Sequence, residues 1–154
     1  MDDLARHLDE RACEKLITRY VRFVDFGEAS RLADLFTPSG VWEADDVVLE
    51  GQDAIRAHFA RREALVRRVS RHYCTNVSVD VLSSQVAKGL AYFLNFRHDR
   101  GEGDLRLPVP AGLPKYGGEY HCQFVRTPDG WRFERLHVDV TFLRPPSAIA
   151  EVAK

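Results

Sequence analysis

The chain contains few of the residues that build disulfide-rich or metal-binding proteins. It has three cysteines in 154 residues, Cys13, Cys74 and Cys122, and no two of them are spaced as CxxC. An odd number of cysteines cannot all pair within one chain, and a zinc site usually has closely spaced cysteine or histidine ligands. We therefore interpret all three as free thiols in a reducing cytoplasm.

Long apolar stretches are absent as well. No hydrophobic run approaches the roughly 20 residues needed to cross a bilayer. The N-terminal sequence MDDLARHLDE is charged and has no apolar signal core. The sequence thus predicts a cytoplasmic protein with no membrane partner.

Neither sign of charge is in excess. Lysine and arginine together number 22, against 23 aspartates and glutamates, which gives a net charge of −1. A general nucleic-acid binder usually has a strong basic excess, so no nucleic-acid partner is expected. Five arginines do cluster, and we interpret them first as a solvated helix face and second as a site for an anionic ligand: Arg61, Arg62, Arg67, Arg68 and Arg71.

The motifs of several enzyme classes are missing. There is no HExxH, no HxH pair and no CxxC, so no metal site is predicted. There is no GxSxG, and the glycines near residue 102 lack the strand-to-helix setting of a phosphate-binding loop. A cysteine nucleophile at Cys74 is open, although its neighbours do not argue for one.

Helical patterns occupy the first half of the chain. Apolar residues at three-and-four spacing predict a helix over 10–26, with Asp9 as its N-cap and Gly27 as its stop. A short apolar set predicts a second helix over 29–36, which Pro38 and Gly40 end. A third helix is predicted over Gln52–Val66.

The apolar period then changes to two, which predicts strands. A small hairpin is expected over Val41–Ala44 and Val47–Leu49, followed by four long strands: Val69–Leu82, Val86–Arg97, Tyr116–Arg126 and Trp131–Leu143. Helices first and strands last indicate a single α+β domain over 1–154, with its core at about 10–143 and helices on one face of an antiparallel sheet. The segment 98–115 is long for a hairpin loop and is either a lid or simply mobile, and 144–154 predicts a short tail helix.

Two polar residues stand out, and each has a plain structural explanation as well as a functional one. Asp25 continues the edge of the buried stripe into the last turn of its helix, where the helix dipole makes a carboxylate more basic. It is either a solvated charge or a base-orienting group. His72 lies inside a strand and shares a face with Ser70, Cys74 and Asn76. It is either a hydrogen-bonded core residue or a group that moves protons.

Further polar residues interrupt the apolar strands. Each alone is compatible with a hydrogen-bonded core group, but together they indicate a mostly apolar cavity that holds a few polar groups. They are Tyr92, Asn95, His121, His137 and Asp139.

Five segments, taken in order, resemble the SnoaL-like branch of the nuclear transport factor 2-like superfamily: YVRFVDFGEASRLADLF, GVWEAD, GQDAIRAHF, RHYCTN and DGWRFERLHVDVTF. The resemblance covers nearly the whole chain. It implies a cone-shaped fold, in which a curved antiparallel sheet and about three N-terminal helices enclose a deep pocket.

Within that superfamily the chain is most similar in pattern to scytalone dehydratase and hexachlorocyclohexane dehydrochlorinase. Both place an aspartate at the end of the first helix, where it orients a histidine on the strand after the third helix. The resemblance implies these roles for Asp25, in FVDFGEASRL, and for His72, in RHYCTN.

Some other site residues of these two enzymes have counterparts in this chain, and some do not. Trp42 falls on a pocket-wall tryptophan of the dehydrochlorinase, and His121 falls where scytalone dehydratase has a substrate-contacting asparagine. The dehydratase's tyrosine beside the aspartate is Val24 here, and its second histidine is Phe93 or Leu94. The dyad and the pocket are therefore implied, whereas the substrates of those enzymes are not.

Residues and resemblance together predict a cofactor-independent lyase with dehydratase-like elimination, or an isomerase or cyclase, acting on a small hydrophobic cyclic molecule. His72 is expected to take a proton from carbon while Asp25 fixes its tautomer. Tyr20, Asn76 or His121 is expected to donate to the oxygen or the leaving group, and Tyr92 and His137 to line the pocket. The alternative is a non-catalytic binding or assembly subunit, such as the small subunit of ring-hydroxylating dioxygenases.

A homodimer or homotrimer is also expected. The outer face of the sheet is predicted to carry Tyr73, Val77 and Val79, and exposed apolar area of this kind usually has a partner. Strand alternation places Val77 and Val79 opposite His72 unless a bulge shifts the register.

Overall fold

Helices are confined to the first half of the chain and long strands fill the second. The computed structural model describes residues 2–65, 67–99 and 106–145. Its elements are helix α1 (Asp3–Asp25), 3-10 helix η1 (Ala29–Leu35), strands β1 (Phe36–Ala44) and β2 (Val47–Glu50), helix α2 (Gln52–Glu63), and strands β3 (Val69–Val81), β4 (Val86–His98), β5 (Tyr116–Thr127) and β6 (Gly130–Leu143). Most of the expected tail and residues 100–105 of the expected lid lie outside the described residues.

Helix α1 is longer than the sequence predicts. Its first turns are largely exposed, so they carry no buried stripe from which a start could be read. Asp9 is therefore inside the helix, and the prediction that it is the N-cap was wrong. Its carboxylate accepts hydrogen bonds from Arg126 and from the indole of Trp131, 3.1 Å away. These bonds hold the N-terminal part of α1 against β5 and β6.

Strand β1 begins earlier than predicted and contains the residues expected to break a helix. Pro38 and Gly40 lie inside it, within a stretch where the pairing of β1 with β6 shifts between Phe36 and Val41. A proline is tolerated at such an irregularity because no regular ladder bond is lost. At Gly40 an added Cβ would lie 2.9 Å from the Phe36 Cβ and 3.0 Å from a backbone oxygen of Phe133, so only glycine fits.

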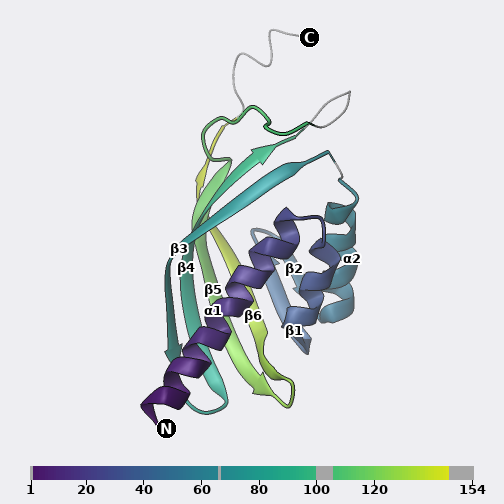
Figure 1. Cartoon of the computed structure of the whole chain (residues 1–154). Coiled ribbons are helices and arrows are strands. Elements are labelled where there is room, and N and C mark those ends of the chain that lie inside the picture. Colours follow the sequence, from purple (N-terminus) through teal and green to yellow (C-terminus); the bar gives the residue numbers. More distant parts are fainter. Residues whose placement is uncertain (1, 66, 100–105, 146–154) are drawn as a thin grey trace.

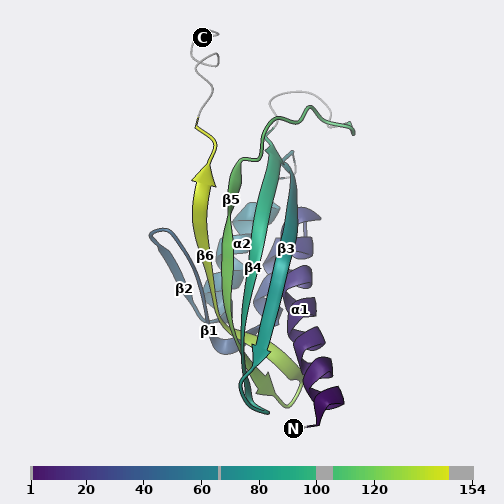
Figure 2. The ribbon, with the colours of Figure 1, turned by 90° about the vertical axis from the view of Figure 1, so that its left-hand side faces the viewer.

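The six strands form one curved sheet in the order β2-β1-β6-β5-β4-β3. Neighbours are antiparallel except β1 and β6, which are parallel, so the sheet is mixed and does not close. The helices cover only its concave side (Figure 1). Seen from the other side, the sheet lies in front and no helix covers it (Figure 2). This arrangement confirms the expected α+β fold with helices on one side of a curved sheet. The expectation of a wholly antiparallel sheet was wrong, because β1 pairs with β6 in parallel.

A bulge in β3 decides which of its residues face the helices. The pairing of β3 with β4 shifts between Thr75 and Ser78, and Asn76 takes a left-handed backbone with φ 52°. Before the bulge, His72 lies on the helix side; after it, Val79 packs against the core. Val79 is therefore not on the outer face as alternation alone predicted, because one inserted residue reverses the facing.

The core fills the space between the helices and the concave side of the sheet. Its largest fully buried side chains include Phe36, Phe124 and Phe133, from three different strands. Helix α1 packs across β3, β4 and β6, whereas α2 packs on η1, β1 and β2. The end of α1 is thereby fixed beside the start of β3, where Asp25 and His72 lie.

Candidate active site

The carboxylate of Asp25 binds His72 at two points. Oδ2 accepts the backbone N–H of His72 at 2.7 Å, and Oδ1 lies 2.7 Å from the ring Nδ1. The Asp25 side chain is 5% exposed and that of His72 is 16% exposed. A donor at both oxygens fixes the carboxylate and the ring together and directs Nε2 away from Asp25.

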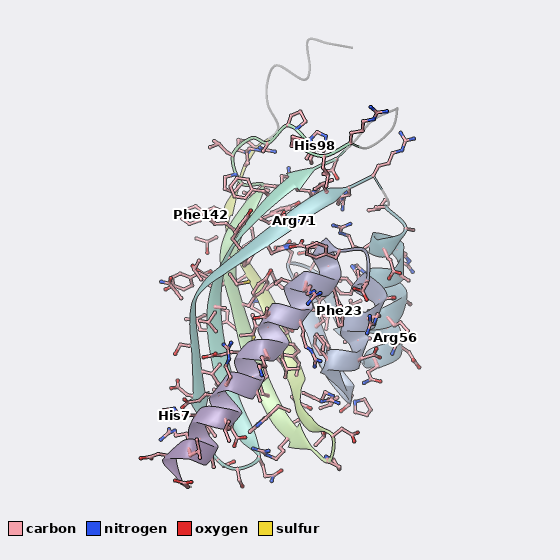
Figure 3. All side chains as sticks on the ribbon, viewed as in Figure 1. His7, Phe23, Arg56, Arg71, His98 and Phe142 are labelled. Carbon is pink, nitrogen blue, oxygen red and sulfur yellow. The ribbon has the colours of Figure 1, made fainter. Side chains whose placement is uncertain are left out.

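Local sequence explains why the aspartate lies there. Asp25 is the last residue of α1, and Gly27 follows in a left-handed conformation with φ 77°, which stops the helix. Arg71, next to His72 on β3 (labelled in Figure 3), donates to the backbone oxygen of Asp25. Its guanidinium also packs against the Phe26 ring. The last turn of α1 is thus attached to β3 by both the backbone and the side chain of Asp25.

The His72 ring lines a cavity of about 270 Å³ between the helices and the sheet. Its wall is mostly apolar and aromatic, and lies against Phe93, whose ring centroid is 6.3 Å from that of His72. Of the residues predicted to contact a ligand, four line this cavity: Tyr20, Val24, Trp42 and Phe93.

Two buried phenols face the cavity. The Tyr20 hydroxyl accepts a hydrogen bond from the Trp42 indole at 2.9 Å, which leaves its own proton available to a ligand. Tyr120 stacks on Phe93 at 4.5 Å between centroids and meets Tyr20 edge to face. Burial raises the pKa of both phenols, so both are protonated donors near neutral pH.

A buried polar pair forms part of the wall. Asn95 donates to the Ser70 hydroxyl at 2.8 Å, and both residues line the cavity. The sequence pointed to Asn95 as a polar residue in an apolar strand. It gave no comparable signal for Tyr120, because an aromatic residue is ordinary in a strand and only the cavity distinguishes it.

Four residues expected to contact a ligand do not line this cavity. They are Asn76, Tyr92, His121 and His137. Asn76 is exposed at the β3 bulge, and the other three lie on the outer face of the sheet, where the His121 and His137 rings are 6.1 Å apart. The structure therefore does not bring them to the cavity where they were expected, because polar residues in a strand mark a water-facing side as readily as a cavity.

The described part of the loop before β5 contacts other hollows. Residues 109–113 line a separate hollow of about 340 Å³ at the ends of β3 and β4. Leu107 lines another, of about 470 Å³, which shares Val24, Arg62 and Arg68 with the cavity around His72. These three side chains therefore border both the cavity and this outer hollow.

The described residues contain neither a candidate metal site nor a helix that could span a membrane. Within ranges 2–65, 67–99 and 106–145, no three histidine, cysteine, aspartate or glutamate side chains form a group that could hold a metal ion. In the same ranges no helix is both long and apolar enough to span a membrane.

Comparison with solved structures shows the same fold. An NTF2-like protein with a cystatin-like fold from Novosphingobium aromaticivorans is 26% identical, with a TM-score of 0.72 over 99% of this chain and 97% of that one. A hexachlorocyclohexane dehydrochlorinase, LinA-type3 from Novosphingobium barchaimii LL02, is 19% identical, with a TM-score of 0.74 over 96% of each chain. A candidate scytalone dehydratase from Novosphingobium aromaticivorans is 22% identical, with a TM-score of 0.73 over 90% of this chain and 87% of that one.

Sequence comparison agrees with the fold. No curated protein matches this chain. The family model described as a SnoaL-like domain matches residues 5–137, which confirms the resemblance that the ordered motifs indicated. The chain belongs to the SnoaL-like family.

Proposed function

We propose that the protein is a cofactor-independent lyase, or an isomerase or cyclase, that removes a proton from carbon in a hydrophobic cyclic molecule. The observation that carries the proposal is the pair of 2.7 Å contacts from Asp25 to the ring and backbone of His72. Family membership and the dehydratase and dehydrochlorinase neighbours support the reaction class.

In the proposed step, Nε2 of His72 is the base. Asp25 accepts a hydrogen bond from Nδ1–H, so the lone pair is on Nε2, and the carboxylate stabilises the imidazolium once it forms. The electron pair of the broken C–H bond becomes a new double bond. Either a leaving group departs from the next carbon, or charge moves onto a carbonyl oxygen, to which Tyr20 or Tyr120 donates.

The mostly apolar wall supports this assignment. A cavity of about 270 Å³ lined by Phe93, Tyr116, Val138 and similar side chains accommodates a small ring system, which would displace water from around His72. Exclusion of water strengthens the interaction of Asp25 with a developing imidazolium. A positioned base of this kind contributes roughly 10²–10⁴-fold in rate.

The test uses 5-nitrobenzisoxazole, a bicyclic carbon acid whose ring opens visibly when a base removes its proton. We expect His72→Ala to reduce the turnover of this probe by about 100-fold or more. His121→Ala, on the outer face, is the matched control and keeps the wild-type rate. Equal turnover by wild type and His72→Ala, or a wild-type rate no higher than that of free imidazole, contradicts the proposal.

A second candidate function is a non-catalytic binding or assembly subunit. The observation that favours it is the sheet face that no helix covers, with Tyr73, Leu94 and Phe142 exposed. The enzyme is the stronger candidate because a purely structural subunit does not need an imidazole held by Asp25 inside a cavity. Two results together would favour the subunit function: the protein purifies with a larger iron-containing subunit, and wild type turns over the probe no faster than His72→Ala does.

A further inference from the structure

Arginines surround the mouth of the cavity, and most are held by other groups of the protein. Arg68 and Arg97 bind the two oxygens of Asp99, at 2.5 and 2.7 Å. Arg71 donates to the backbone oxygen of Asp25 at 3.2 Å. These three guanidinium groups therefore have partners of their own.

Arg62 differs from them. It is partly buried near the end of α2 and lines both the cavity and its outer hollow. Across residues 2–65, 67–99 and 106–145, no hydrogen bond or ion pair reaches its guanidinium. Burial, with Arg68 and Arg97 nearby, lowers its pKa, although a guanidinium stays charged at neutral pH. A partly buried charge without a direct partner is unfavourable unless something else binds there.

The position of Arg62 near the end of α2 does not by itself explain why its side chain is partly buried. A cation is favoured in the last turn of any helix, and Arg61 occupies the same turn of α2. Arg61 is exposed, whereas Arg62 is directed into the hollow. The rival explanation is that Arg62 balances the charge of Asp25 across the cavity, without touching it.

We propose that Arg62 is the anion-binding group of this cavity and that the substrate is an apolar ring bearing a carboxylate. The ring packs against the aromatic wall near His72, and the carboxylate binds Arg62 at the mouth. This inference rests on the proposed function, since it names the substrate class of the same site. Arg62 is partly exposed and borders both the cavity and the outer hollow, so the charged group stays near water while the ring is buried.

A carboxylate fits better than a dianion such as phosphate. A single planar guanidinium matches a carboxylate with two parallel hydrogen bonds. Arg68 and Arg97 share the one charge of Asp99, and Asp45 adds a second negative charge to the lining. Little positive charge remains beyond that of Arg62, so a singly charged group is the match.

The experiment measures binding without turnover. Wild type is titrated by calorimetry with 2-naphthoate and with its neutral analogue 2-naphthamide. The pH is about 8, above the ordinary pKa of a histidine side chain, so that a histidine cation does not contribute to binding of the carboxylate. We expect the carboxylate to bind about 10- to 100-fold more tightly than the amide. Arg62→Gln should abolish that preference, and the exposed neighbour variant Arg61→Gln should retain it.

Two further measurements keep the result decisive. Arg62→Lys should keep part of the preference, because it keeps the charge and loses the planar fork. If Arg62→Gln does not fold, the two ligands are titrated into wild type at increasing salt concentration. Salt should weaken binding of the carboxylate and should not weaken binding of the amide.

Two outcomes overturn the inference: wild type shows no preference for the carboxylate, or a folded Arg62→Gln shows the same preference as wild type. A role limited to balancing Asp25 predicts that second outcome. Since no proton transfer is measured, failure here leaves the His72 probe assay unaffected.

Discussion

The two oxygens of Asp25 bind one residue, His72, at its backbone amide and at its imidazole. Because the backbone bond fixes the carboxylate, the ring can keep its hydrogen bond only in one orientation. Nδ1 is then the protonated nitrogen and Nε2 carries the lone pair. The geometry thus sets the tautomer as well as the position of the ring.

Replacing this carboxylate by an amide should reverse the tautomer. In Asp25→Asn, an NH2 group replaces one of the two carboxylate oxygens. This group must face either the backbone N–H or the ring of His72. The ring can satisfy that donor only by accepting at Nδ1, which places the proton on Nε2. We expect probe turnover to fall about 100-fold or more, as when a catalytic histidine takes the wrong tautomer.

Asp80→Asn is the matched control, because Asp80 is exposed on the same strand as His72 and does not line the cavity. Nitrogen NMR of the His72 ring reports the tautomer directly. A turnover near the wild-type value in Asp25→Asn, or an unchanged tautomer, contradicts this account.

The sequence predicted the fold, the central pair and part of the cavity wall, but it also placed four residues there that lie elsewhere. Asp25 and His72 could be paired because two motifs in a known order imply a helix end beside a strand. Asn76, Tyr92, His121 and His137 were misplaced because alternation along a strand shows that residues share a face and does not show which face is covered. At Asn76 the bulge adds a second uncertainty, since one extra residue reverses the facing.

The sequence alone does not distinguish Arg62 from the arginines beside it. In the sequence it is one of five clustered arginines, and a solvated helix face was the first interpretation. The exposed Arg61 fits that interpretation, and the neighbouring Arg62 does not. Which of two adjacent arginines turns inward depends on how α2 packs, and helix periodicity with so few apolar residues does not determine it.

Asp9 should stabilise the fold in a pH-dependent way. Burial alone would raise its carboxyl pKa, but hydrogen bonds from Trp131 and Arg126 outweigh burial, so the pKa is lowered. A lowered folded-state pKa means that the contribution is present above the unfolded pKa of about 3.9 and is lost as pH falls through the folded value. Asp9→Asn should therefore reduce the free energy of unfolding by about 1–2 kcal/mol near neutral pH, and by less in acid.

Urea unfolding at a series of pH values measures this effect. Asp129→Asn, an exposed change in the turn between β5 and β6, serves as the control and should change little at any pH. A deficit in Asp9→Asn that stays the same from neutral pH into acid would show that the carboxylate is not responsible.

The cysteines should be unreactive in the folded protein. Burial raises the pKa of the Cys13 thiol to about 12, with Asp9 adding to the effect. Burial, and then Asp25, raises the pKa of Cys74 to about 12, and burial raises that of Cys122. Because the thiolate is the reactive form, Ellman's reagent at about pH 8 should react at least about 100-fold more slowly than in urea. Fast labelling that disappears in Cys74→Ser would contradict this and return Cys74 to consideration as a nucleophile.

An exposed apolar row on the outer face should mediate self-association. Tyr73 pairs with Leu94, Leu94 with Gly117, and Gly117 with Phe142, so the row crosses four strands. The three side chains are 58%, 45% and 70% exposed, and Phe142 projects from the side of the sheet opposite the helices (Figure 3). Gly117 adds no side chain between Leu94 and Phe142, where an added Cβ would lie 3.1 Å from Leu94.

We propose that this row is buried against a second copy of the chain, because a symmetric contact buries the same row twice. Light scattering coupled to gel filtration should then give a multiple of the 17.6 kDa chain mass, as a dimer or a trimer. Leu94→Asp should shift the protein to the monomer mass, because it places a charge in the middle of the row, and Gln123→Asp on the polar part of the same face should not. Since Leu94 lies outside the cavity, the monomeric variant should still bind 2-naphthoate. A wild-type monomer, or an oligomer that persists in folded Leu94→Asp, would show that the row is not the contact.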